Sequence, residues 1–99
     1  MPRPTTTFSF GPQVPLTEAE ATLRLAILAV ESLHGANRVQ LEMHIHVDRG
    51  QRCCSIDNTT DVGRTLAVIF SGYVLREFGE ENVSIVSDGN TVCTSGDAR

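Results

Sequence analysis

Two histidines and a cysteine near the middle of the chain have the residue types and the spacing of metal ligands. In the stretch EMHIHVDRGQRCC, His44 and His46 occupy alternate positions and Cys53 follows a turn. Alternate side chains of a strand share one face, about 7 Å apart, and a hairpin through this turn places Cys53 opposite His46. Two imidazoles and a thiolate are ligands that zinc accepts. The sequence therefore offers His44, His46 and Cys53 as candidate metal ligands.

The same three residues also suit the solvent-facing side of an ordinary hairpin. Nothing nearby supplies a fourth ligand, and no C-x-x-C spacing accompanies the histidines. Because histidine is common on open sheet faces, we favour a hairpin without metal and expect no bound cofactor. A small-ligand or metal-binding regulatory domain, using the outer face of the hairpin over residues 38–56, is the alternative function.

A second candidate is the segment NTTDVGR, residues 58–64. Hydroxyls, a glycine and Arg64 at the start of a helix can bind a phosphate. The spacing is not that of a P-loop, however, and Asp61 places negative charge where the anion would lie. Capping of the helix accounts for the same residues. We therefore expect no catalytic residues and no enzymatic activity.

Length, charge and composition are typical of a small globular domain. The 99 residues form one domain, 1–99, with residues 1–4 and 95–99 as disordered tails. The net charge of −4 opposes nucleic-acid binding, and the most apolar run, residues 23–30, is too short to cross a membrane. Three cysteines, an odd number, indicate reduced thiols rather than a disulfide framework, and hence a cytoplasmic protein.

Hydrophobic periodicity and capping residues predict two helices. The first begins at Thr17, where Thr17 and Glu20 form a capping box, and ends at Gly35. The second is capped by Asn58, Thr59 or Thr60 and ends at Gly79. The predicted core stripes of the two helices are Ala19, Leu23, Ala26, Ile27 and Val30 on the first, and Val62, Leu66, Ile69, Phe70 and Tyr73 on the second.

Alternation of apolar and polar residues predicts the strands. Residues 5–10 and 83–87 have this pattern, and residues 38–47 alternate without interruption. A turn around Gly50 leads to a strand over residues 52–56, with Val47 opposite Arg52. This register buries Met43, Ile45, Cys54 and Ile56 and exposes Glu42, His44, His46 and Cys53. A short fifth strand after the Asp-Gly turn at residues 88–89 completes the pattern.

The predicted element order is β-α-β-β-α-β. Right-handed crossovers convert this order into one antiparallel sheet of strand order 4-1-3-2, with both helices on one face. The expected fold class is therefore α+β, a ferredoxin-like sandwich. This expectation concerns the fold alone and does not indicate a function.

Apolar residues on the outer side of the helices suggest a partner. Leu25 and Leu28 lie nearly opposite the core stripe of the first helix, and Val68 and Leu75 occupy a similar side of the second. A contiguous apolar surface usually marks an interface. We expect an interaction or assembly module, a homodimer or a partner of another protein, in contact through Leu25, Leu28, Val68 and Leu75. Pairing through the sheet edge formed by residues 39–47 is a competing route.

Overall fold

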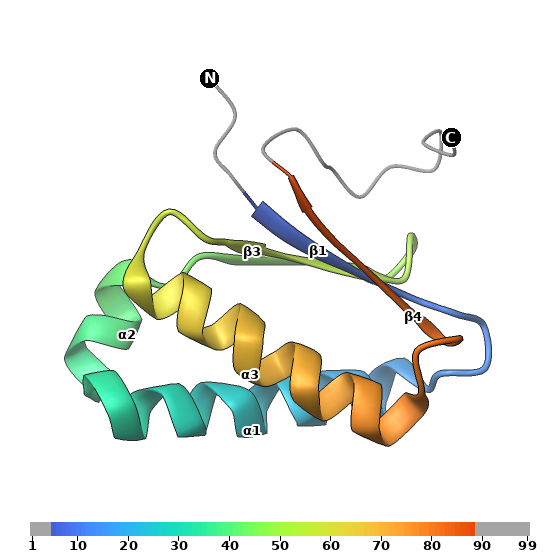
Figure 1. The fold of residues 1–99 in the computed structure, drawn as a ribbon, viewed down its shortest axis with the longest axis horizontal. Coiled ribbons are helices and arrows are strands. Elements are labelled where there is room, and N and C mark those ends of the chain that lie inside the picture. Colours follow the sequence, from blue (N-terminus) through green and yellow to red (C-terminus); the bar gives the residue numbers. More distant parts are fainter. Residues whose placement is uncertain (1–4, 89–99) are drawn as a thin grey trace.

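The computed structural model describes residues 5–88 as a four-stranded antiparallel sheet and three helices. In chain order the elements are β1 (Thr5–Phe10), α1 (Leu16–His34), α2 (Ala36–Glu42), β2 (Ile45–Asp48), β3 (Cys53–Asp57), α3 (Asp61–Phe78) and β4 (Val83–Asp88). The long helices α1 and α3 lie side by side against the same face of the sheet (Figure 1). The α+β class and the antiparallel sheet are therefore confirmed.

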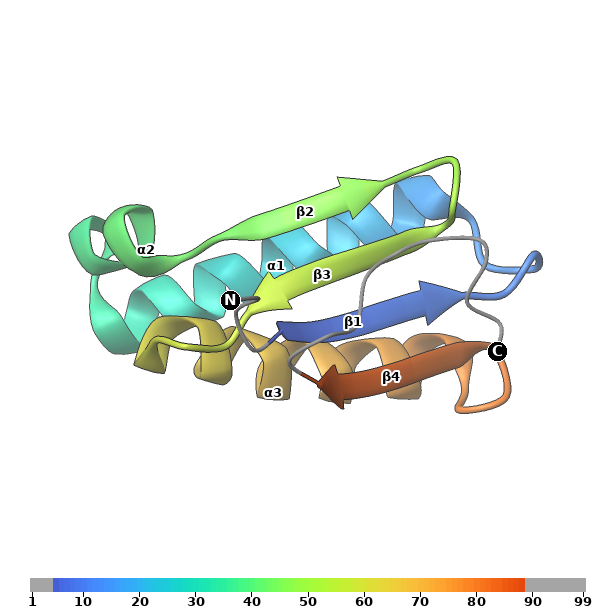
Figure 2. The same ribbon diagram turned by 90° about the horizontal axis from the view of Figure 1, so that it is seen from above.

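The sheet has β1 and β3 at its centre and β2 and β4 at its edges (Figure 2). Read from the β4 edge, the strand order is 4-1-3-2. The tails at residues 1–4 and 95–99 and the short fifth strand after residue 88 lie outside the described residues. Within residues 5–88, no helix combines the length and the apolar character needed to cross a membrane.

The expected strand over residues 38–47 is wrong in its first half, because residues Ala36–Glu42 form the helix α2. The hairpin partner β3 ends at Asp57, whose amide donates to the His44 carbonyl at 2.9 Å. Among residues 5–88, no strand therefore lies beside the residues directly before His44. Their alternation of apolar and polar side chains does not make them a strand. In the helix, Val39 is buried and Leu41 is exposed, and Arg38 pairs with Glu42 one turn later.

The β2–β3 register differs by two residues from the predicted one. Val47 lies opposite Cys54, not Arg52. Arg52 belongs to the turn, with a positive φ of 56°, and its guanidinium donates to the carbonyl oxygens of Gly11, at 2.7 Å, and of Val14. These bonds fasten the tip of the hairpin to the β1–α1 loop. Since side chains alternate with a period of two, a shift of two leaves Cys54 facing the helices.

Both helices end where expected, but only α3 begins as predicted. Thr60 is the N-cap of α3, and its hydroxyl accepts a hydrogen bond from the Gly63 amide at 3.0 Å. The capping box on α1 is wrong, because the helix begins at Leu16 after Pro15 without a side-chain cap. Thr17 therefore lies inside the first turn.

Phe8, Phe70 and Ile56 are the largest fully buried side chains of the core, which lies between the sheet and the two long helices. The ring of Phe70 lies 4.7 Å from that of Phe8, centroid to centroid. Most predicted core positions are confirmed. The exceptions are Met43, Ile45, Ile27 and Ile69, which are only partly buried, and Tyr73, which is 40% exposed. Val74, absent from the predicted stripe, is fully buried.

Candidate functional site

The hairpin does not bring His44, His46 and Cys53 together as a set of ligands. His46 is exposed and lies opposite Ser55, whereas Cys53 lies opposite Asp48. His44 precedes β2 and is also exposed. Among residues 5–88, no group of three histidine, cysteine or carboxylate side chains is placed to hold a metal ion.

Cys53 differs most from the sequence-based expectation. It is 4% exposed rather than open to solvent, and its sulfur takes part in a disulfide bond. The expectations of an exposed Cys53 and of only reduced thiols are therefore both wrong. No single-sequence pattern indicated this bond, because two adjacent cysteines in an odd total point away from a framework.

Cys54, the neighbouring residue, is a free and buried thiol. It borders a hollow of about 20 Å³ between the start of α1 and the hairpin tip, a space for about one water molecule. Burial raises the pKa of the Cys54 thiol to about 12, and the negative charge of Glu20 acts in the same direction. A thiol that keeps its proton at neutral pH is a poor nucleophile and a poor metal ligand.

The raised pKa of Cys54 predicts a loss of stability in alkali. Below the unfolded-state pKa, near 9.0, both states hold the proton and the stabilisation is complete. As the pH rises from about 9 to about 12, only the unfolded state ionises, so the free energy of unfolding falls by up to about 1.4 kcal/mol per pH unit. Urea denaturation from pH 7 to 11 measures this loss. The Cys54→Ala variant should show a shallower decline, and an equal decline would contradict the prediction.

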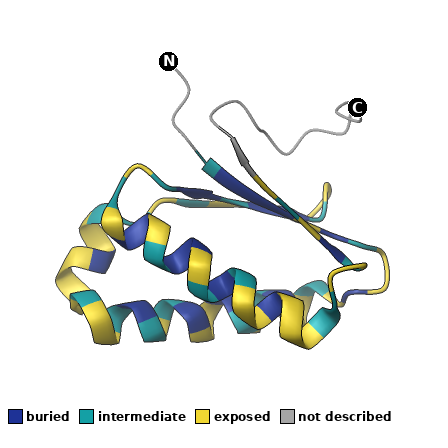
Figure 3. Cartoon of the chain, in the orientation of Figure 1, coloured by how far each residue is buried: buried dark blue, intermediate teal, exposed yellow. Residues whose placement is uncertain are grey.

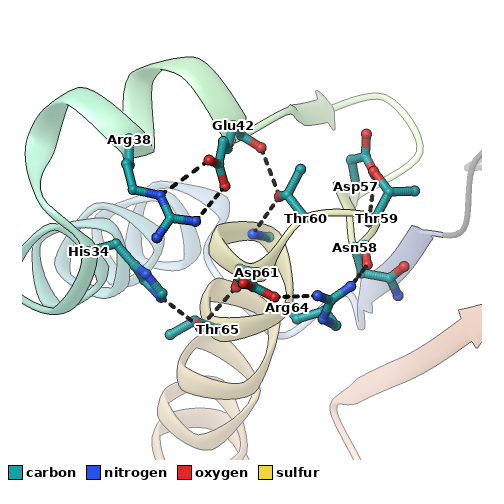
Figure 4. A network of polar contacts seen from close by, with 11 residues as sticks. His34, Arg38, Glu42, Asp57, Asn58, Thr59, Thr60, Asp61, Arg64 and Thr65 are labelled. Atoms are coloured by element: carbon teal, nitrogen blue, oxygen red, sulfur yellow. Dashed lines mark hydrogen bonds and ion pairs between the residues drawn. The ribbon is translucent and has the colours of Figure 1, made fainter.

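A polar network surrounds the N-terminus of α3, where the sequence suggested an anion site (Figure 4). The Asp57 carboxylate accepts from the amide and the hydroxyl of Thr59, at 2.9 and 2.7 Å. Asp61 forms an ion pair with Arg64, and Arg64 also donates to the Asn58 carbonyl at 3.2 Å. These side chains are engaged in closing the loop and capping the helix, as the capping interpretation predicts.

The same network fastens α3 to the helices before it. The Thr60 hydroxyl donates to the Glu42 carbonyl at the end of α2, at 2.9 Å. The Thr65 hydroxyl donates to the Asp61 carbonyl, so it must accept from Nε2 of His34 at the end of α1, 3.0 Å away. The network therefore has a structural role: it fixes the corner at which the three helices meet (Figure 4).

The four residues that the sequence placed at an interface lie on α1 and α3. Both helices carry many exposed positions (Figure 3). Leu25 and Leu28 are 59% and 58% exposed, and Val68 and Leu75 are 71% and 38% exposed. Neither the sheet nor the neighbouring helix covers them, although α1 and α3 pack against each other. We name these four residues the outer helical surface.

Two further exposed leucines were missed by the sequence analysis. Leu33 is 68% exposed near the C-terminal end of α1. Leu41 lies on α2, and its assignment to a strand hid its exposure. Only Leu33 adds to the apolar character of α1.

Comparison with known proteins adds no assignment, because no protein-family model, no curated protein and no solved structure matches this chain.

Proposed function

We propose that this chain is a small assembly module without catalytic activity, in which two copies associate through the outer helical surface. The observation that carries the proposal is the exposure of Leu25, Leu28 and Val68, each more than half open to solvent. A large apolar side chain gains about 1.5–3 kcal/mol when it is taken out of water. Exposed apolar side chains of this size, on two helices that pack against each other, are typical of protein–protein interfaces.

A second copy of the same chain is the partner that we infer. Two-fold homodimers are the commonest oligomers, and a two-fold axis brings one surface into contact with itself. The outer helical surface suits this arrangement because apolar residues meet apolar residues whichever helix lies opposite. Its residues lie on long helices that are fixed to each other by the His34–Thr65 hydrogen bond, so the surface needs little rearrangement before it binds.

We also infer that the fold is ferredoxin-like. Three features support this inference: the strand order, the antiparallel sheet and the placement of α1 and α3 on one face. The short helix α2 is then an insertion in this fold, between the first long helix and the second strand. In such a sandwich the outer side of the helical layer is open for contacts with another molecule.

The double variant Leu25→Glu, Leu28→Glu tests the proposal. Four added carboxylates in a two-fold contact repel one another and remain costly to bury, so the mass measured by sedimentation at 100–500 µM should fall by about half relative to wild type. Circular dichroism should show an unchanged fold, because both positions are exposed.

Leu41→Glu is the matched control. It introduces the same charge at a leucine that is 77% exposed but lies on α2, away from the outer helical surface, and it should leave the mass unchanged. A wild-type protein that is monomeric at these concentrations, or a double variant with wild-type mass, would contradict the proposed function.

A further inference from the structure

The edge of β2 has backbone groups that point away from the sheet. In the β2–β3 register, the Asp57 amide bonds to the His44 carbonyl. Hydrogen-bonded and non-hydrogen-bonded pairs alternate along an antiparallel ladder, so His46 and Asp48 also direct their backbone groups towards β3. The amides and carbonyls of Ile45 and Val47 then point outward. Among residues 5–88, β2 has a strand on one side only, so no described strand pairs with these outward groups, and such an edge can accept another strand.

The side chains of β2 are complementary to a second copy of β2 in antiparallel orientation. His46 and Asp48 share the outer face of the sheet, because Val47 between them faces the helices. If two copies of β2 pair with Val47 opposite the partner's Val47, His46 lies opposite the partner's Asp48, twice across the axis. The same register makes Val47 exchange its outward amide and carbonyl bonds with the partner's Val47, as a narrow pair of an antiparallel ladder does.

The flank of α1 beneath β2 has the same self-complementarity. An open groove between α1 and β2 is lined by three apolar residues, Leu23, Ile27 and Val47, and by five polar ones, Glu20, Arg24, His46, Asp48 and Arg49. Arg24, Ile27 and Glu31 follow at helical spacing along this side of α1. Two antiparallel copies of α1 centred between Ile27 and Leu28 bring Arg24 opposite the partner's Glu31. Since Ile27 and Val47 line one groove, a single two-fold axis passes close to both centres.

We propose that the β2 edge and the α1 flank form a second self-association surface, which joins two sheets into one continuous antiparallel sheet. Four residues of β2 provide few hydrogen bonds, and Val47, which is 41% exposed, and the partly buried Ile27 supply the apolar area. The axis of this contact runs normal to the sheet, whereas an axis through the outer helical surface lies in the helical layer. Where two such axes intersect at a right angle, they generate a closed assembly of four copies.

The edge contact shares only Leu28 with the outer helical surface. The four-copy assembly, but not the edge contact, rests on the proposed function. The two contacts are separated by two variants in sedimentation experiments at 100–500 µM. Val47→Pro removes the outward amide and leaves every bond to β3 in place, since proline is tolerated on the solvent side of an edge strand. Wild type should have the mass of about four chains, Val47→Pro that of about two, and Val47→Pro with Leu25→Glu and Leu28→Glu that of one.

Charge reversal on α1 provides a test that a change in folding cannot imitate. Arg24→Glu and Glu31→Arg each place like charges opposite each other in the pair, and each should weaken the edge contact at least fivefold. The combination of both restores opposite charges and should restore the wild-type mass. These measurements use the Leu25→Glu, Val68→Glu background, which changes the outer helical surface at two exposed positions and leaves the α1 flank unchanged.

The control Val47→Ile keeps the amide and the β-branched side chain and should retain the wild-type mass. Equal masses for wild type and Val47→Pro would overturn the edge contact. The proposed function would still be tested separately, by the Leu25→Glu, Leu28→Glu variant. A Leu25→Glu, Val68→Glu protein that is already monomeric would overturn the edge contact as well.

Discussion

Gly63→Ala should be the most destabilising single-methyl change in the molecule. A Cβ at position 63 would overlap the carbonyl oxygen of Asp57 and lie 3.0 Å from its carbonyl carbon. The obstacle is backbone, so a rotamer change cannot relieve it, and the first turn of α3 must move away from the end of β3. We expect a loss on the order of 5 kcal/mol, enough to unfold a marginally stable domain. Urea denaturation followed by circular dichroism measures it.

Gly72→Ala is the matched control, made on the same helix. A Cβ at position 72 meets no atom within 4 Å, and alanine is favoured over glycine inside a helix by about 1 kcal/mol. This variant should therefore be more stable than wild type. A Gly63→Ala protein with wild-type stability would show that α3 does not approach β3 as closely as the structure places it.

The importance of Gly63 illustrates what the sequence does not reveal. In the segment of residues 58–64 the glycine suggests phosphate binding or an unremarkable helix start. Its actual role depends on the distance between two elements, and no local pattern encodes that distance. The cap at Thr60 was predictable, by contrast, because a hydroxyl that accepts an amide within three residues is a local interaction.

Strand alternation was informative only where a partner strand existed. Residues 5–10 alternate and form β1 between two neighbours. Residues 38–43 alternate as regularly but have no partner strand among residues 5–88, because the chain turns away after Asp57. Helix α2, with its Arg38–Glu42 pair, satisfies the backbone of most of this segment internally. Pairing is a property of two segments, so the pattern of one cannot determine it.

The candidate sites show the same contrast between features set by local spacing and features set by tertiary contacts. Exposure of the outer helical surface followed from helical spacing alone, since the opposite face of each helix is recognisably the core stripe. The environment of Cys53 did not, because its burial and its disulfide bond depend on tertiary contacts. The role of Arg52 was missed for the same reason: its guanidinium bonds to carbonyls of Gly11 and Val14, about 40 residues earlier in the chain.

Phe70→Ala is the second large effect that we expect. Phe70 is 1% exposed, and its ring lies 4.7 Å from that of Phe8 and 6.3 Å from that of Phe10. Truncation removes the contact of α3 with two residues of the central strand and leaves a cavity that rigid strands cannot fill. The free energy of unfolding should fall by about 3–5 kcal/mol. Chemical denaturation at neutral pH measures the change.

Tyr73→Ala separates this core effect from a general loss of aromatic area on α3. Tyr73 belongs to the same predicted stripe but is 40% exposed, so its truncation forfeits less burial and leaves a gap that water can enter. We expect a loss of about 1 kcal/mol. An equal loss of stability in the two variants would show that α3 does not turn Phe70 towards the core and Tyr73 away from it. The exposure of Val68 and Leu75 depends on the same orientation of α3 and would then lose its support.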